Sequence, residues 1–107
     1  MAEKLTIKME NVKEGDSRYY WVNIESGDIR IGKARVRKIY RKIIIKNINI
    51  FPEFERHGFA AQTVDLFKET AIEIIADRVR NTARGFWEKM GFKDRGDGNY
   101  RWIAEHR

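Results

Sequence analysis

The sequence predicts one α/β domain built on a mixed, mostly antiparallel sheet that is flanked by helices. Residues 4–50 consist of β-rich runs separated by polar turns. Residues 51–104 alternate helical segments with short apolar runs, an order that adds a parallel strand pair to an antiparallel start. The 107 residues suffice for one modest core, and no repeat or linker divides them. We therefore expect a single domain over residues 1–107.

Four strands are expected in the first half of the chain. Residues 4–9 alternate apolar and polar side chains, as a half-buried strand does, and residues 11–17 form a polar turn region. Residues 18–24 and 29–40 are β-rich and flank a Ser-Gly-Asp hairpin turn. Residues 41–50 form the next strand, whose three consecutive isoleucines predict burial on both faces.

The second half is expected to contain two helices, one strand and a closing hairpin. A helix over residues 56–70 would present an apolar face formed by Phe59, Ala60, Val64 and Phe67. The other expected elements are a strand at 72–76, a helix at 81–90 that ends at Gly91, and hairpin strands at 92–93 and 99–104.

The composition excludes several classes of site. The chain has no cysteine, which rules out disulfides, thiolate metal sites and a cysteine nucleophile. His57 and His106 are its only histidines, so we expect no metal. No apolar run approaches the roughly 20 residues that span a membrane. We expect a soluble cytoplasmic protein with no membrane partner.

Basic residues dominate the middle of the chain. The formal net charge is +6, and no acidic residue occurs between Asp28 and Glu53. The basic residues of this interval are Arg30, Lys33, Arg35, Arg37, Lys38, Arg41, Lys42 and Lys46. Such a block can attract an anionic cofactor, an acidic protein or nucleic acid, or it can be the solvated face of a sheet. The last interpretation is the simplest.

Aromatic residues near this block also have two interpretations. Residues 19–21, Tyr-Tyr-Trp, are a stacking platform for nucleic acid if they lie beside Arg18 and Arg30. A strand with one face in the core explains them more simply. Trp102 is interpreted as a core residue or a dimer contact.

Residues 43–62 are predicted to form a strand that ends at a proline turn and is followed by a helix that begins near Gly58. The first N–H groups of such a helix have no helical partner, and the helix dipole adds positive charge there. Gly58 and Ala60 would let a ligand approach the main chain. The stretch predicts a phosphate site, with an ordinary strand–turn–helix joint as the alternative.

Two motifs carry a family resemblance. Residues 81–92, NTARGFWEKMGF, resemble the N..A..FYEKLGF helix of the GNAT N-acetyltransferase superfamily, and residues 52–60, PEFERHGFA, resemble its pyrophosphate loop, (Q/R)-x-x-G-x-(G/A). The resemblance covers residue 43 to the C-terminus. It implies a short, minimal GNAT-like fold, acetyl-CoA as co-substrate and transfer of acetyl to a primary amine, with a protein amine among the candidates.

The resemblance also implies the residues that bind the cofactor. They are Ile48, Asn49, Ile50, Arg56, His57, Gly58, Phe59, Ala60, Asn81, Phe86, Trp87 and Lys89. Backbone N–H groups of residues 56–60 would hold the diphosphate, the main chain of 48–50 would pair with the pantetheine arm, and Asn81 would bond that arm. Phe86 and Trp87 would line the sulfur end.

Three residues are candidates for catalysis. Glu53 and Tyr40 are candidate proton acceptors, because residues 41–50 contain no acid where the family often has a glutamate. Trp87 stands where many members have a tyrosine that protonates the thiolate. Glu55 replaces the loop's Gln or Arg, and Asn81 lies one residue nearer Phe86 than in the common spacing.

The chain also lacks room for the helices that family members place between the first two strands, so we expect an open acceptor groove. That groove suits a macromolecular amine, such as one on an acidic protein, or completion by a second subunit in a homodimer. Two alternative functions stay open: a degenerate GNAT-like protein that binds CoA or a partner without turnover, and a basic nucleic-acid-binding module.

Overall fold

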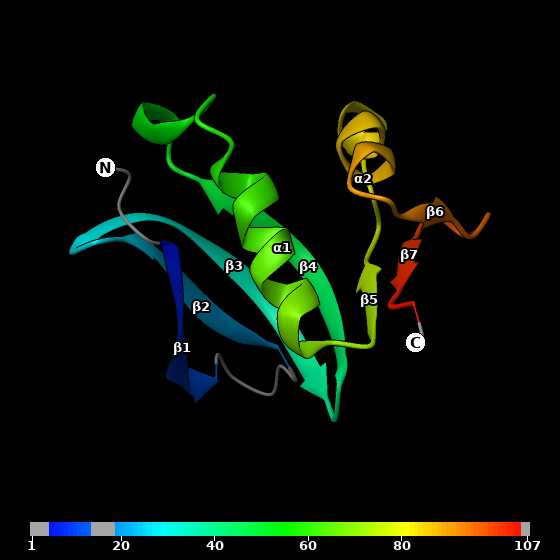
Figure 1. Ribbon diagram of the computed structural model, residues 1–107, viewed down its shortest axis with the longest axis horizontal. Coiled ribbons are helices and arrows are strands. Elements are labelled where there is room, and N and C mark those ends of the chain that lie inside the picture. Colours follow the sequence, from blue (N-terminus) through cyan, green and yellow to red (C-terminus); the bar gives the residue numbers. More distant parts are fainter. Residues whose placement is uncertain (1–4, 14–18, 106–107) are drawn as a thin grey trace.

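The computed structural model describes residues 5–13 and 19–105. Their strands form one sheet in the spatial order β1-β2-β3-β4-β5-β7-β6 (Figure 1). The strands are β1 (Leu5–Lys13), β2 (Tyr20–Ser26), β3 (Ile29–Ile39), β4 (Lys42–Ile50), β5 (Glu73–Ala76), β6 (Lys93–Asp94) and β7 (Tyr100–Ile103). The helices are α1 (Phe59–Thr70), α2 (Arg84–Lys89) and the 3-10 turns η1 (Pro52–Phe54) and η2 (Asn81–Ala83).

The pairing confirms the expected mixed, mostly antiparallel sheet. Strands β4 and β5 run parallel, because α1 carries the chain back across the sheet between them. The other described pairs are antiparallel. Within the described ranges, no helix is long and apolar enough to cross a membrane.

Helix α1 covers one face of this sheet (Figure 1), where it packs on β1, β4 and β5. Val64 and Phe67 lie on its buried side, as predicted, together with Thr63, whose hydroxyl donates to the Phe59 carbonyl at 2.8 Å. The strand side chains buried beneath and around the helix include Val22, Ile24, Ala34, Val36, Ile43, Ile45 and Ile74. This α1 face holds the hydrophobic core.

The opposite face of the sheet, the far face, is polar and basic. Trp21 stands there, because it alternates with the buried Val22. Lys33 Nζ lies 4.5 Å and Arg35 Cζ 5.4 Å from the centroid of its ring. The predicted strand is confirmed as β2. Its core-facing side chains are the aliphatic Val22 and Ile24, whereas Trp21 faces Lys33 and Arg35 on the far face. Ile44 also points to the far face and is half-buried, in line with the expectation for the triple isoleucine.

Several boundaries differ from the predicted ones. Strand β1 continues to Lys13, past the expected end at residue 9, because residues 5–9 and Lys13 all pair with β2 around a bulge. Helix α1 begins at Phe59 and not at Arg56, because Arg56 and Gly58 have left-handed φ values of 68° and 75°. The expected helix over 81–90 is divided into η2 and α2. Residues 14–17 of the predicted turn region and Arg18, the first residue of the predicted strand over 18–24, lie outside the described residues.

Candidate functional site

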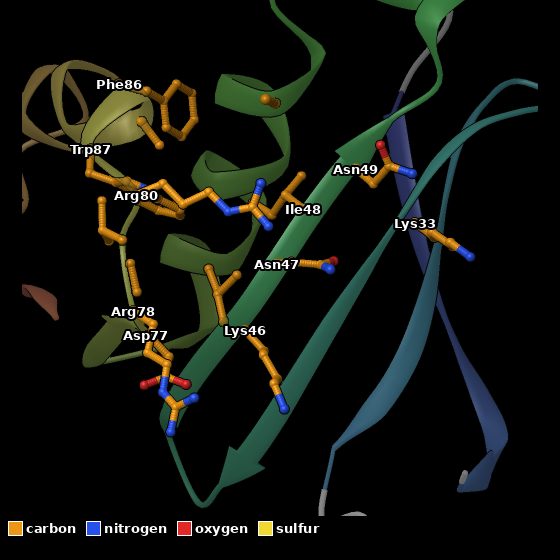
Figure 2. Close-up of a pocket in the computed structure, with 15 residues that line it drawn as sticks. Lys33, Lys46, Asn47, Ile48, Asn49, Asp77, Arg78, Arg80, Phe86 and Trp87 are labelled. Atoms are coloured by element: carbon orange, nitrogen blue, oxygen red, sulfur yellow. The ribbon is translucent and has the colours of Figure 1, made fainter. Parts of the chain in front are cut away.

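Strands β4 and β5 separate and leave an opening between them. Their parallel pairing runs from Lys42 opposite Glu73 to Ile45 opposite Ala76, where β5 ends while β4 continues to Ile50. A cavity of about 780 Å³ occupies this opening (Figure 2). Its lining residues are Lys33, Ile45, Lys46, Asn47, Ile48, Asn49, Ala60, Ala76, Asp77, Arg78, Val79, Arg80, Ala83, Phe86 and Trp87.

The chain after β5 is drawn away from β4 by the closing hairpin. The Asp77 N–H donates to the Ile45 carbonyl at 2.9 Å, which is the last link to β4. Arg78 then takes a left-handed φ of 51°, and its N–H donates to Asn99 Oδ1 at 2.8 Å. Next along the chain, the Val79 N–H donates to the Gly98 carbonyl at 2.8 Å. The opening therefore exists because this segment hydrogen-bonds with the β6–β7 loop.

Strand β4 is irregular at the same level. Val36 pairs with Ile45, and Arg35 pairs with Asn47, so Lys46 is an extra residue on β4. Such a bulge bends the strand and redirects side chains, which is common beside active sites. Here it places Lys46 at the start of the opening.

The N-terminus of α1 supplies backbone donors at one side of the opening. The first α-helical bond runs from the Gln62 N–H to the Gly58 carbonyl at 3.0 Å, so the N–H groups of residues 59–61 have no partner within the helix. A Cβ added to Gly58 would meet nothing within 4 Å, which shows an open approach to the main chain. Ala60 itself lines the cavity. The site can accept an anion.

Helix α2 closes the cavity with aromatic rings. Phe86 lies 5.0 Å from Trp87 in an edge-to-face arrangement, and Trp87, 8% exposed, packs on Phe92 at 4.8 Å. Arg84 fixes the helix, because its Nε donates to the Tyr100 hydroxyl at 2.9 Å and its Nη2 lies 3.5 Å from the Asp94 carboxylate. The bond to Tyr100 and the nearby Asp94 raise the pKa of Arg84 above its ordinary value.

The structure brings together five of the residues predicted from sequence. Ile48, Asn49, Ala60, Phe86 and Trp87 line the cavity. The other predicted cofactor residues do not line it, although Phe59 and Gly58 begin the neighbouring helix. They are Ile50, Arg56, His57, Gly58, Phe59, Asn81 and Lys89.

Two of the three predicted catalytic residues also lie outside the cavity lining. Tyr40 is 95% exposed in the β3–β4 turn, at the end of β4 remote from Ile50, so the structure does not bring it to the opening. Glu53 is exposed in η1. Trp87 is the third, and it does line the cavity.

Sequence reasoning identified Lys33 and Lys46 as part of a basic block but did not predict the charged lining of the opening. Lys33, Lys46, Asp77, Arg78 and Arg80 are part of it, and Figure 2 shows the Arg80 side chain directed across the opening toward Ile48. The spacing of the second motif was the available signal for Arg80. Asn81 lies one residue nearer Phe86 than in the common spacing, so Arg80 occupies the position that the asparagine has in that spacing. In the part of the chain that the structure describes, no group of three or more His, Asp or Glu residues is placed to hold a metal ion.

Comparison with solved structures decides the fold. A GNAT family acetyltransferase from Elizabethkingia anophelis with acetyl-CoA bound superposes with a TM-score of 0.64, at 12% identity, over 94% of this chain and 98% of that one. A Bacillus subtilis acetyltransferase in complex with CoA gives 0.63, at 15% identity, over 95% and 100%. A spermidine N-acetyltransferase from Vibrio cholerae gives 0.68, at 16% identity, over 92% and 93%.

The chain has the GNAT acetyltransferase fold. Searches with the sequence found no matching family model and no matching curated protein. The GNAT resemblance of the two motifs is thus confirmed at the level of fold, as is the α/β class. The coverage of nearly whole chains shows that the resemblance extends beyond residues 43–107 into the first strands.

Proposed function

We propose that this protein is an N-acetyltransferase that moves the acetyl group of acetyl-CoA to a primary amine. The observation that carries the proposal is the position of the α1 N-terminus beside the opening between β4 and β5. Its backbone donors and the cavity of about 780 Å³ suit a long ligand with an anionic end and a reactive end. CoA or acetyl-CoA is bound in several solved structures of the same fold.

We assign roles in cofactor binding on the same basis. The N–H groups of residues 59–61 would bind the diphosphate, with Arg56 and His57 adding charge at the exposed rim. The main chain of residues 48–50, beyond the last pair with β5, would pair with the amides of the pantetheine arm. Phe86 and Trp87 would enclose the sulfur end.

The reaction forms a carbon–nitrogen bond and breaks the carbon–sulfur bond of the thioester. The amine must lose a proton to attack, and the leaving thiolate takes one up. Asp77 is the only carboxylate among the described residues that line the cavity, which favours it over the exposed Glu53 as the proton acceptor, directly or through water. Trp87 can donate a hydrogen bond from its indole but is no practical acid. Proximity of amine and thioester would supply much of the acceleration.

Calorimetric titration with CoA and with acetyl-CoA at moderate salt tests the proposal, followed by release of free thiol over a panel of amines. We expect saturable binding and acceptor-dependent release. Binding without release on any amine would favour a CoA-binding protein that lacks activity. Failure to bind either compound, with the protein folded, would overturn the proposal.

A further inference from the structure

Four cations line the opening between β4 and β5. Lys33 comes from β3, Lys46 from the β4 bulge, and Arg78 and Arg80 from the segment after β5. Asn47 and Asn49 also line it, and Asp77 is the single carboxylate among the lining residues that the structure describes. We call Lys33, Lys46, Arg78 and Arg80 together the cationic mouth, and Figure 2 shows their side chains.

Among the side chains that the structure describes, no carboxylate forms an ion pair with a residue of the cationic mouth. Across the side chains of residues 5–7 and 19–105, the ion pairs formed with carboxylates do not include Lys33, Lys46, Arg78 or Arg80. Lys33 Nζ lies over the Trp21 ring at 4.5 Å, and Lys46 Nζ lies over the Tyr19 ring at 5.2 Å. These contacts orient the two ammonium groups while leaving their positive charge available to a ligand.

Such a mouth discriminates between acceptors by charge. Two like charges held close together repel, and the repulsion is stronger in a partly enclosed site than in bulk water. A polyamine, which carries several positive charges, would meet this repulsion at the mouth. An amine with carboxylates or phosphates beside it would gain the opposite interaction.

The same charges help the chemistry. Nearby positive charge disfavours the ammonium form of an amine and so lowers its pKa. A bound acceptor would therefore lose its proton more readily in the cationic mouth than in water. A larger fraction of the bound amine would then already be deprotonated, so the reaction would depend less on proton transfer to Asp77.

We infer that the acceptor is an anionic amine, one that carries carboxylate or phosphate groups next to the reactive nitrogen. This inference rests on the proposed function and specifies its substrate class. The cationic side chains continue along β3, where Lys33, Arg35 and Arg37 alternate onto the far face. A peptide with acidic residues around its amine can extend along this strip, whereas a small amino acid would occupy the mouth alone.

The test compares acetyl transfer to peptides that present one amine among acidic, neutral or basic neighbours, with glutamate and spermidine as small acceptors. We expect kcat/KM for the acidic peptide to exceed that for the basic peptide by at least about tenfold, and the ratio to shrink as salt is raised. Higher kcat/KM for glutamate than for the acidic peptide would identify a small acceptor. Higher kcat/KM for the basic peptide or spermidine would overturn the inference.

Charge variants locate the effect. Lys46→Glu should remove the preference for the acidic peptide, whereas Lys38→Glu, the same change at an exposed β3 residue outside the mouth, should preserve it. Titration of CoA-loaded protein with each peptide gives a second measurement that does not need turnover. CoA binding without charge preference among the peptides would overturn only this inference, and absence of CoA binding would overturn the proposed function.

Discussion

The two faces of the sheet are built on different principles. The α1 face carries Val22, Ile24, Val36 and Ile45, each at most 2% exposed. The far face presents mainly lysine, arginine and asparagine from the same strands, together with Trp21 and Ile44, because successive side chains alternate. One face therefore holds the fold together, while the other is available for a ligand. The opening between β4 and β5 connects them.

The largest expected effect is a difference in the free energy of unfolding between variants on the α1 face and variants on the far face. Ile45→Ala removes a 1% exposed side chain from the α1 face, and we expect a loss of about 2–5 kcal/mol in the free energy of unfolding. Ile44→Ala, the neighbouring change on the far face, should cost less than about 1.5 kcal/mol, because Ile44 is only half-buried. Urea unfolding of both variants measures the difference. Equal losses would mean that the far face is also core.

The next effect concerns the cofactor side of the opening. Gly58→Asp places a carboxylate at the proposed phosphate site, and we expect the Kd for CoA to rise about 100- to 1,000-fold by like-charge repulsion. Gly58→Asn is the matched control, since asparagine has the same size without charge and tolerates the positive φ of 75°. Calorimetry measures both. Unchanged CoA affinity in the aspartate variant would refute the phosphate site.

The third effect concerns Asp77, which lines the opening after β5. Asp77→Asn removes the proposed proton acceptor, so kcat should fall about 100-fold near neutral pH. The defect should lessen at higher pH, where more of the amine is already deprotonated. The loss of negative charge should meanwhile lower KM for an anionic acceptor. A pH profile of kcat and KM checks these changes, and an unchanged kcat would assign the proton transfer elsewhere.

The smallest effect tests what holds the opening apart. Asn99→Ala removes the oxygen that accepts from the Arg78 N–H, and we expect a loss of about 1 kcal/mol in the free energy of unfolding, with weaker CoA binding. Asn99→Asp keeps an acceptor oxygen and should lose less. Thermal unfolding and calorimetry measure the two changes. If alanine and aspartate behave alike, this bond does not shape the opening.

Local sequence patterns were sufficient to predict most of the helices and strands but not the residues at which they begin and end. The hairpin turn at Gly27 and the strands on both sides of it were predicted, because adjacent residues determine a tight turn. The start of α1 was predicted three residues early, since a pattern of apolar residues does not reveal the left-handed φ of Arg56. Tyr40 was proposed as a base on residue type, and only the β3–β4 pairing shows that it lies in an exposed turn.

The sequence by itself determined the α/β class, the succession of strand, turn and helix over residues 43–62, the absence of cysteine chemistry and the excess of positive charge. Only the tertiary structure decided where that charge gathers. Lys33, Lys46 and Arg80 are far apart along the chain. Lys46 and Arg80 line the same opening as Lys33 because β4 bulges at Lys46 and because the segment after β5 bonds to Asn99, 21 residues from Arg78. Turns and periodicity depend on neighbours in sequence, whereas a strand register and a long-range hydrogen bond depend on residues that only folding brings together.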